Sequence, residues 1–235
     1  MSRIVRQWKV LLLTAVVAVA ALAIGGPYVY ANFIAEDAPP PLSVALPGPG
    51  AAATGDTTAA TANGTWKVSS GSQAGYRVKE VLNGQRVEAA GRTSDVTGTI
   101  TIDSQSVTAG SFTVDLRTVA SDSSMRDNQF RGRIMETSQY PNATLKLSNT
   151  VQLPSIPAVG AQVTGKASGE LTLHGITKPV SFDVTAARTG AASFDIAATI
   201  PVVFADYSIA NPSFAPMVTT EDSGVIEVLL KFTKG

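Results

Sequence analysis

Few residues in this sequence could carry out chemistry, and none of them falls in a catalytic motif. The 235-residue chain has no cysteine and one histidine, His174, which excludes a thiolate nucleophile, a cysteine-ligated metal and a multi-histidine metal site. His174 lies between two strand patterns, and we interpret it as a surface residue of a tight turn. The sequence has no Gly-rich phosphate loop, nucleophile elbow or paired acidic cluster. We therefore expect a protein that is not an enzyme and that uses no metal or cofactor.

The main polar candidate is a cluster of three arginines, Arg126, Arg131 and Arg133. Guanidinium groups make paired hydrogen bonds to phosphate, so the cluster could clamp a phosphate or diphosphate group. The plainer interpretation, a salt bridge from Arg126 and two solvated arginines, is favoured. The whole chain has 18 basic and 18 acidic residues, and this balance leaves no basic stripe of the kind that binds nucleic acid.

The elements that would position these residues are β-strands. From Trp66 onwards, short segments of alternating apolar and polar residues recur between turn residues, which is typical of antiparallel strands with one buried face. We expect an all-β domain of about eight strands, folded as a sandwich or a closed barrel. The interior of an eight-stranded barrel can be filled by side chains or can hold a small ligand, and the sequence fits both.

One segment, Ser121 to Ile134, breaks the strand pattern. It begins with Ser and Asp residues and continues with Met125, Phe130 and Ile134 at roughly helical spacing. Ser121 or Ser123 can cap a short helix by accepting from its free N–H groups. We expect the apolar side of this helix to pack over the barrel or across its mouth.

The N-terminal part has the features of a membrane element. Residues 10–34 are predominantly apolar, with no charged residue between Lys9 and Glu36, and this length suffices to span a bilayer. Three basic residues within positions 1–9 predict a cytoplasmic N-terminus. We therefore expect a single-pass protein of the cell membrane with an extracytoplasmic C-terminal domain. A cleaved signal peptide, with 29–31 as the cleavage context, is the alternative and would also translocate the domain.

A linker separates this segment from the β domain. Residues 35–64 are rich in Pro, Ala and Thr, a composition that cannot bury enough apolar surface to order itself. We expect a flexible, extended tether over 35–64, followed by one domain over 65–235.

Two segments in the middle of the chain carry a family resemblance. The first, residues 118–147, contains Arg126-Asp127, Phe130, Tyr140-Pro141 and a Leu-Lys-Leu strand; the second, Gly169 to Val180, reads GELTLHGITKPV. Together with Trp66 in the first strand, they resemble the YceI-like family of extracytoplasmic lipid-binding barrels. The anchor and linker resemble its membrane-tethered, actinobacterial-type members.

The resemblance implies a lipocalin-like extended antiparallel β-barrel with one short helix. Its apolar tunnel would bind a long-chain lipid of the polyisoprenoid, quinone or fatty-acyl type, for transport or storage. The alternative is a non-catalytic envelope-stress or protein-interaction module with a filled barrel. The expected partners are the lipid and, through the N-terminal helix, the membrane; a homodimer is left open, and no cofactor is expected beyond a bound isoprenoid-type lipid.

The candidates for lipid contact are apolar residues on the inward strand faces or on the short helix, where ordinary core packing is the competing role. They are Tyr76, Val78, Phe112, Val114, Met125, Phe130, Ile134, Met135, Phe182 and Phe204. The three arginines of the basic cluster are the candidates for contact with a lipid head group.

Overall fold

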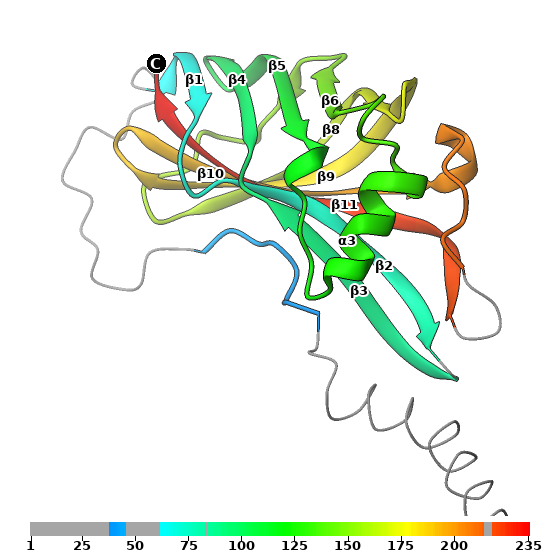
Figure 1. Cartoon of the computed structure of the whole chain (residues 1–235). Helices are drawn as coiled ribbons and strands as arrows, with labels where there is room; N and C mark the ends of the chain where they lie inside the picture. Colours follow the sequence, from blue (N-terminus) through cyan, green and yellow to red (C-terminus); the bar gives the residue numbers. More distant parts are fainter. Residues whose placement is uncertain (1–37, 46–61, 83, 214–217) are drawn as a thin grey trace, which may run out of the picture.

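The alternating segments pair into one antiparallel sheet that curls into a barrel, as a computed structural model of the chain shows (Figure 1). The structure describes residues 38–45, 62–82, 84–213 and 218–235. The strands are β1 (Gly64–Val68), β2 (Gln73–Leu82), β3 (Gln85–Thr93), β4 (Val96–Asp103), β5 (Ser106–Asp115), β6 (Asn142–Leu147), β7 (Val151–Gln152), β8 (Gln162–Leu173), β9 (Ile176–Gly190), β10 (Ser193–Val203) and β11 (Val218–Lys234). The helical segments are η2 (Leu116–Thr118), α3 (Ser124–Gln129), η3 (Phe130–Ile134) and η4 (Phe204–Tyr207).

Eight of these strands close the barrel. They follow the order β1-β4-β5-β6-β8-β9-β10-β11, and the C-terminal end of β11 pairs back onto β1, with Trp66 opposite Lys234. The rest of β11 pairs with β2, and β2 with β3, so this hairpin extends the sheet beyond the closed ring. The predicted closed antiparallel barrel with one short helix is confirmed.

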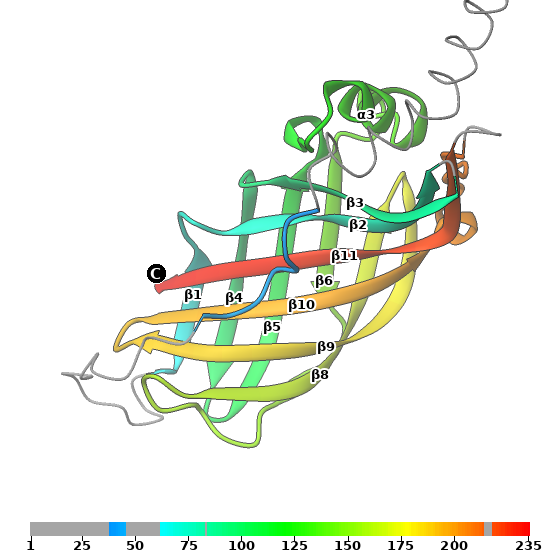
Figure 2. The same ribbon diagram turned by 90° about the horizontal axis from the view of Figure 1, so that it is seen from below.

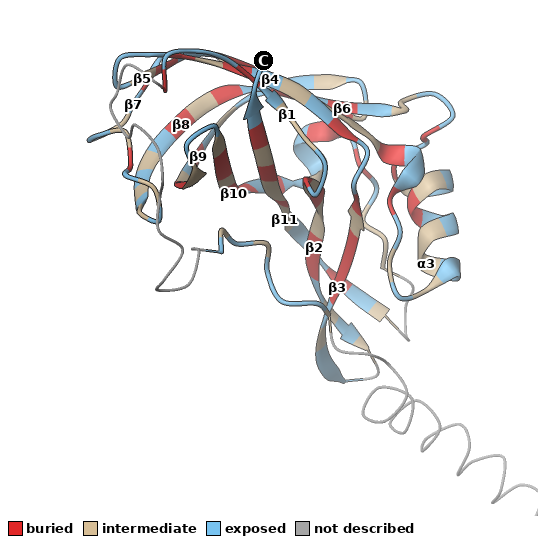
Figure 3. Cartoon of the chain, turned by 90° about the vertical axis from the view of Figure 1, so that its left-hand side faces the viewer, coloured by how far each residue is buried: buried red, intermediate tan, exposed pale blue. Residues whose placement is uncertain are grey.

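The barrel is flattened into two crossing layers. From below, β3, β2, β11, β10, β9 and β8 run side by side, while β1, β4, β5 and β6 cross behind them (Figure 2). Buried residues alternate with more exposed ones along β10 and β11 (Figure 3), as expected for strands with one face towards the interior.

Aromatic side chains pack together at the end of the barrel where β1 meets β11. Trp66 is fully buried and its Nε1 donates to the carbonyl oxygen of Ala62 at 2.8 Å. Its ring meets that of Phe194 edge-on, with centroids 4.8 Å apart, and Phe232 is 1% exposed. Aromatic side chains bury large areas, so this cluster anchors the first strand that the family resemblance predicted.

The predicted helix over Ser121–Ile134 is present, with a break in its geometry. Ser123 is the N-cap and its side chain accepts from the N–H of Arg126. The α-helical turns of α3 pass at Phe130 into the π-helical η3. The helix lies beyond the β3 edge of the sheet (Figures 1 and 2), and this places its apolar residues at the open end of the barrel.

The hairpin of β2 and β3 is the main element that sequence reasoning missed. The segment Gln85–Thr93 forms β3, whereas no strand was predicted there. The sequence signal was an Asn-Gly pair at 83–84, which is typical of a two-residue hairpin turn, and Gly84 adopts the left-handed φ of +85°.

The N-terminal predictions fall mostly outside the described residues. The predicted membrane helix over 10–34 lies wholly outside them, and in the part of the chain that the structure describes no helix has the length and apolar character needed to cross a membrane. Within the predicted linker, residues 38–45 form an extended segment that crosses the outer face of β2 and β11 (Figure 2).

Candidate functional site

A large cavity opens at the α3 end of the barrel. Its volume is about 1390 Å³, and its lining residues come mainly from β2, β3, β11, α3 and η3, with single residues from β5, η2, β6, β8, β10 and η4. Most of its deeper wall is apolar, with Leu116, Val119, Leu173, Val202 and Ile209 among the lining residues. Ligand pockets typically measure about 300–1000 Å³, so this space suits a ligand larger than a typical small molecule.

A second cavity of about 120 Å³ lies deeper in the barrel, lined almost entirely by apolar residues. The two cavities share three lining residues, Val114, Ala143 and Ile226, and are therefore adjacent at this point. The barrel therefore contains open space at its α3 end and a smaller space further in, which argues against the alternative of a completely filled barrel.

All ten apolar residues predicted from the sequence border one of these cavities. Those in the large cavity are Tyr76, Val78, Val114, Met125, Phe130, Ile134, Met135 and Phe204. Those in the small cavity are Phe112, Phe182 and again Val114. Met125 is 70% exposed at the mouth, whereas Phe130 and Met135 are buried. Contact with a lipid at these positions stays a prediction.

The three arginines do not converge on the cavity. Arg126 lines it but its Nη1 donates to Asp122 in an ion pair. Arg131 donates to the carbonyl oxygen of Val119 at 3.2 Å and to the side chain of Asn128 at 3.1 Å. Arg133 donates to Gln129 and to the carbonyl oxygen of Pro212. Each arginine therefore binds the protein itself, which favours the plainer of the two sequence interpretations.

Tyr76 and Phe130 form a stacked aromatic pair at the mouth. Their centroids are 5.0 Å apart and their planes 13° from parallel. Gly91 lies directly across from Tyr76 on β3, and a Cβ at Gly91 would come within 2.5 Å of Tyr76 Cε1. The absent side chain at Gly91 thus makes room for the ring. Burial raises the pKa of Tyr76 to about 12, so its hydroxyl is neutral and available as a donor at ordinary pH.

Glu80 is a polar group inside the large cavity that sequence reasoning missed. Glu80 lies two residues after Val78 on β2, so its side chain is on the same inward face as those of Tyr76 and Val78. Thr220 is its cross-strand partner on β11. Burial raises the pKa of the Glu80 carboxyl, against smaller opposing effects of the Arg126 guanidinium and the Thr220 hydroxyl. The signal was present in the sequence, because the period-2 pattern that faces Tyr76 inward also faces Glu80 inward.

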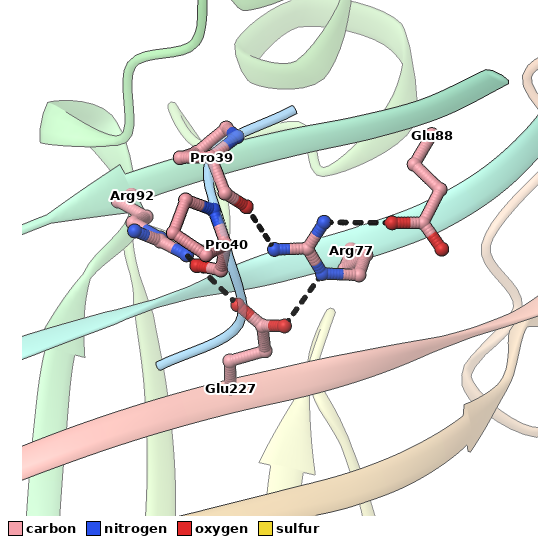
Figure 4. Close-up of polar contacts among 6 residues, drawn as sticks. All are labelled: Pro39, Pro40, Arg77, Glu88, Arg92 and Glu227. Atoms are coloured by element: carbon pink, nitrogen blue, oxygen red, sulfur yellow. Dashed lines mark hydrogen bonds and ion pairs between the residues drawn. The ribbon is translucent and has the colours of Figure 1, made fainter. Parts of the chain in front are cut away.

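The outer face of the same hairpin and of β11 carries a partly buried charge cluster, made of Arg77, Glu88, Arg92 and Glu227 (Figure 4). Arg77 donates to Glu227 at 2.6 Å and to Glu88 at 2.8 Å, and Arg92 Nη2 lies 3.3 Å from Glu227. The side chains of Arg77 and Glu227 are 9% and 4% exposed, although both point away from the barrel interior.

The segment 38–45 covers this charge cluster. Arg77 Nη2 donates to the carbonyl oxygen of Pro39, and Arg92 Nη2 to that of Pro40 (Figure 4). Proline carbonyls remain free to accept in an extended segment. These contacts hold the described part of the predicted tether against β2 and β3, so the flexibility expected from composition does not apply to residues 38–45.

His174 differs from its prediction. It lies in the expected tight turn, with a left-handed φ of +50°, but its side chain is only 10% exposed. Its Nε2 lies 3.0 Å from Glu136 Oε2 and its Nδ1 3.1 Å from the carbonyl oxygen of Tyr207. The surface location was wrong, because the ring ties the β8–β9 turn to the segment after η3 and to η4. Among the described residues, no group of His, Asp or Glu is placed to hold a metal ion.

Comparison with known proteins identifies the fold. The family model of the YceI-like domain matches residues 66–232. The chain belongs to the YceI-like domain family. This match covers the barrel from Trp66 through most of β11, as the family resemblance predicted.

Two solved structures have the same fold as this YceI-like chain. One is a polyisoprenoid-binding domain from Saccharophagus degradans, with a TM-score of 0.57, 18% identity and coverage of 74% of this chain and 99% of that one. The other is BcnA from Burkholderia cenocepacia, with a TM-score of 0.55, 20% identity and coverage of 70% and 98%. A search among curated proteins gave no significant match.

Proposed function

We propose that this protein binds a long-chain apolar lipid, of the polyisoprenoid, quinone or fatty-acyl type, in its barrel and thereby transports or stores it without catalysing a reaction. The observation that carries the proposal is the large cavity continued by a small apolar one through the Val114, Ala143 and Ile226 junction. A space of this length and apolar character suits a chain rather than a compact ligand. The binding of polyisoprenoid by a structural neighbour supports it.

The driving force would be burial of the lipid chain. Each buried CH₂ contributes about 0.8 kcal/mol, so ten methylenes contribute about 8 kcal/mol before the cost of association is subtracted. Such a contribution needs no exact polar match. We place the barrel outside the cytoplasm, attached to the membrane by residues 10–34; this rests on the pattern of the N-terminal sequence.

The first test is extraction of the purified full chain with organic solvent and mass spectrometry of the extract. We expect a stoichiometric apolar lipid, or uptake of added geranylgeraniol by the lipid-free protein. Recovery of no lipid, together with no uptake, would refute the proposal.

A variant sharpens this test. Ala143→Phe places a ring at the junction of the two cavities, so it is expected to weaken binding of the C20 alcohol geranylgeraniol far more than binding of the C10 alcohol geraniol. Lys146→Phe, on the same strand but exposed, is the matched control and should bind both alcohols as the wild type does. Equal loss for both chain lengths would mean that the chain does not pass the junction.

A further inference from the structure

Among the described residues, Glu80 is a charged side chain at the large cavity for which the structure shows no ion pair. Glu80, Asp122 and Arg126 all border the cavity, and Arg126 is already paired with Asp122. The charge of Glu80 therefore remains. The other four charged residues at the cavity, Lys79, Arg86, Glu88 and Glu221, are all exposed, and Glu88 is paired with Arg77.

Glu80 faces the cavity beside a second polar group, the Thr220 hydroxyl. Cross-strand partners share a face of the sheet, and Thr220 is the partner of Glu80. Thr220 is 4% exposed, and its hydroxyl lies close enough to the Glu80 carboxyl to oppose the rise in the pKa of that carboxyl. Both groups border a cavity whose deeper wall is apolar.

We propose that the cavity takes a lipid whose head group donates hydrogen bonds and carries no negative charge, with Glu80 as its acceptor and the Thr220 hydroxyl beside it. This inference rests on the proposed function and specifies its ligand. Hydroxyl and amino head groups share this chemistry.

A phosphorylated head group fits the site poorly. It would bring negative charge towards Glu80 in a partly water-excluded space, where charge interactions are stronger than in bulk water. The basic cluster offers little compensation, because Arg126 is paired with Asp122 and because Arg131 and Arg133 are bonded to other parts of the protein. A donor head group meets no such opposition, since a carboxyl group accepts hydrogen bonds whether it is ionised or neutral.

An aromatic pair lies on the same inward face as Glu80. Tyr76 is stacked on Phe130, and its hydroxyl stays protonated because burial raises its pKa to about 12. Tyr76 and Glu80 are four residues apart on the same face of β2, so a head group at Glu80 would lie on the side of the cavity that carries this aromatic pair.

The test compares three C20 lipids that differ only in the head group: geranylgeraniol, geranylgeranylamine and geranylgeranyl diphosphate. Their dissociation constants are measured by calorimetry on the lipid-free full chain, for the wild type, for Glu80→Gln and for Glu170→Gln. Glu170 is exposed on the outer side of β8 and serves as the matched control.

We expect the wild type and Glu170→Gln to bind the alcohol or the amine at least about tenfold more tightly than the diphosphate. In Glu80→Gln, binding of the diphosphate should strengthen and binding of the amine should weaken, because the repelling or attracting charge is gone. A preference for the alcohol over the amine would identify a hydroxyl head group, and the reverse an amino one.

Several results would overturn the inference. Diphosphate binding equal to or tighter than that of the other lipids, or a head-group preference unchanged in Glu80→Gln, would remove Glu80 from the head-group site while leaving lipid binding intact. Failure of all three lipids to bind would instead refute the proposed function and this inference with it.

Discussion

The buried ion pair beneath residues 38–45 offers the sharpest test of the structure. Arg77→Met would remove the guanidinium that donates to Glu227 at 2.6 Å and to Glu88 at 2.8 Å. Glu227 would keep only Arg92, at 3.3 Å, while its side chain stays 4% exposed. The carbonyl oxygen of Pro39 would also lose its donor.

Removing one partner of a buried ion pair costs about 3–5 kcal/mol, because the other charge is left uncompensated. Two features move the expected loss to the low end of this range. Arg92 still offers Glu227 a positive charge, and the pair lies on the outer side of the barrel under a single extended segment, with water close by. We therefore expect Arg77→Met to lower the free energy of unfolding by about 3 kcal/mol.

The assay is urea unfolding of the full chain followed by tryptophan fluorescence, for which buried Trp66 is a suitable probe. With a denaturant slope of about 1–3 kcal/mol per molar, the midpoint should fall by about 1–3 M. Lys166→Met is the control, because its pair with Asp183 is almost fully exposed and such pairs contribute little.

A second variant separates charge from packing. In Arg77→Met/Glu227→Gln the buried carboxylate is gone, so the double variant should recover part of the stability that the single variant loses. A single variant as stable as the wild type would show that the pair is not buried as described. A double variant whose loss equals the sum of the two single losses would show that Arg77 and Glu227 do not interact.

Two further predictions concern the cavity wall. Glu80→Gln should stabilise the protein at neutral pH. Burial raises the native pKa of Glu80 above its ordinary value of 4.5. The stability of the wild type therefore falls as the pH rises from 4.5 through the native pKa, and the variant lacks this loss. Unfolding free energies measured from about pH 4 to about pH 8 check this, and an equal pH slope in both proteins would contradict it. Gly91→Ala should lower stability by about 1–3 kcal/mol, because its Cβ would lie 2.5 Å from Tyr76 Cε1 and displace the ring from Phe130. Gly132→Ala, which meets nothing within 4 Å, is its control in the same unfolding assay, and equal stability of the two variants would refute the close packing of Tyr76.

The barrel could be predicted because its information is local and periodic. Alternation along β10 and β11, the Ser123 cap and the turn at His174-Gly175 are each visible within a few residues. The hairpin that was not predicted shows the limit of local patterns. The β3 segment QRVEAAGRT alternates weakly, and the Asn-Gly turn before it is the clearest local signal of a hairpin. Inward apolar residues were located correctly for the same reason. The period-2 pattern shows on which face of the sheet a side chain lies, although it does not show which residue that side chain contacts.

Contacts between residues distant in the chain could not be predicted in this way. Arg77 and Glu227 are separated by 150 positions and meet only because β2 pairs with β11. The ring of His174 is buried because segments 33 and 38 residues away pack on it. A local pattern could not show these neighbours, and composition likewise predicted a flexible tether at Pro39 and Pro40, where two arginines on the folded sheet supply donors.

The β2–β3 hairpin connects the two polar features that sequence reasoning missed. Its inward face carries Glu80 and Tyr76 into the cavity, and its outward face carries Arg77 and Arg92 to residues 38–45. β3 lies at the end of the strand order, and among the described residues its one bridge beyond β2 joins Arg92 to Ala120. Edge strands with so few partners depend on what covers them. The outer charge cluster and the segment across it therefore stabilise the same wall that shapes the cavity mouth, so that a change at Arg77 acts on both faces of the hairpin.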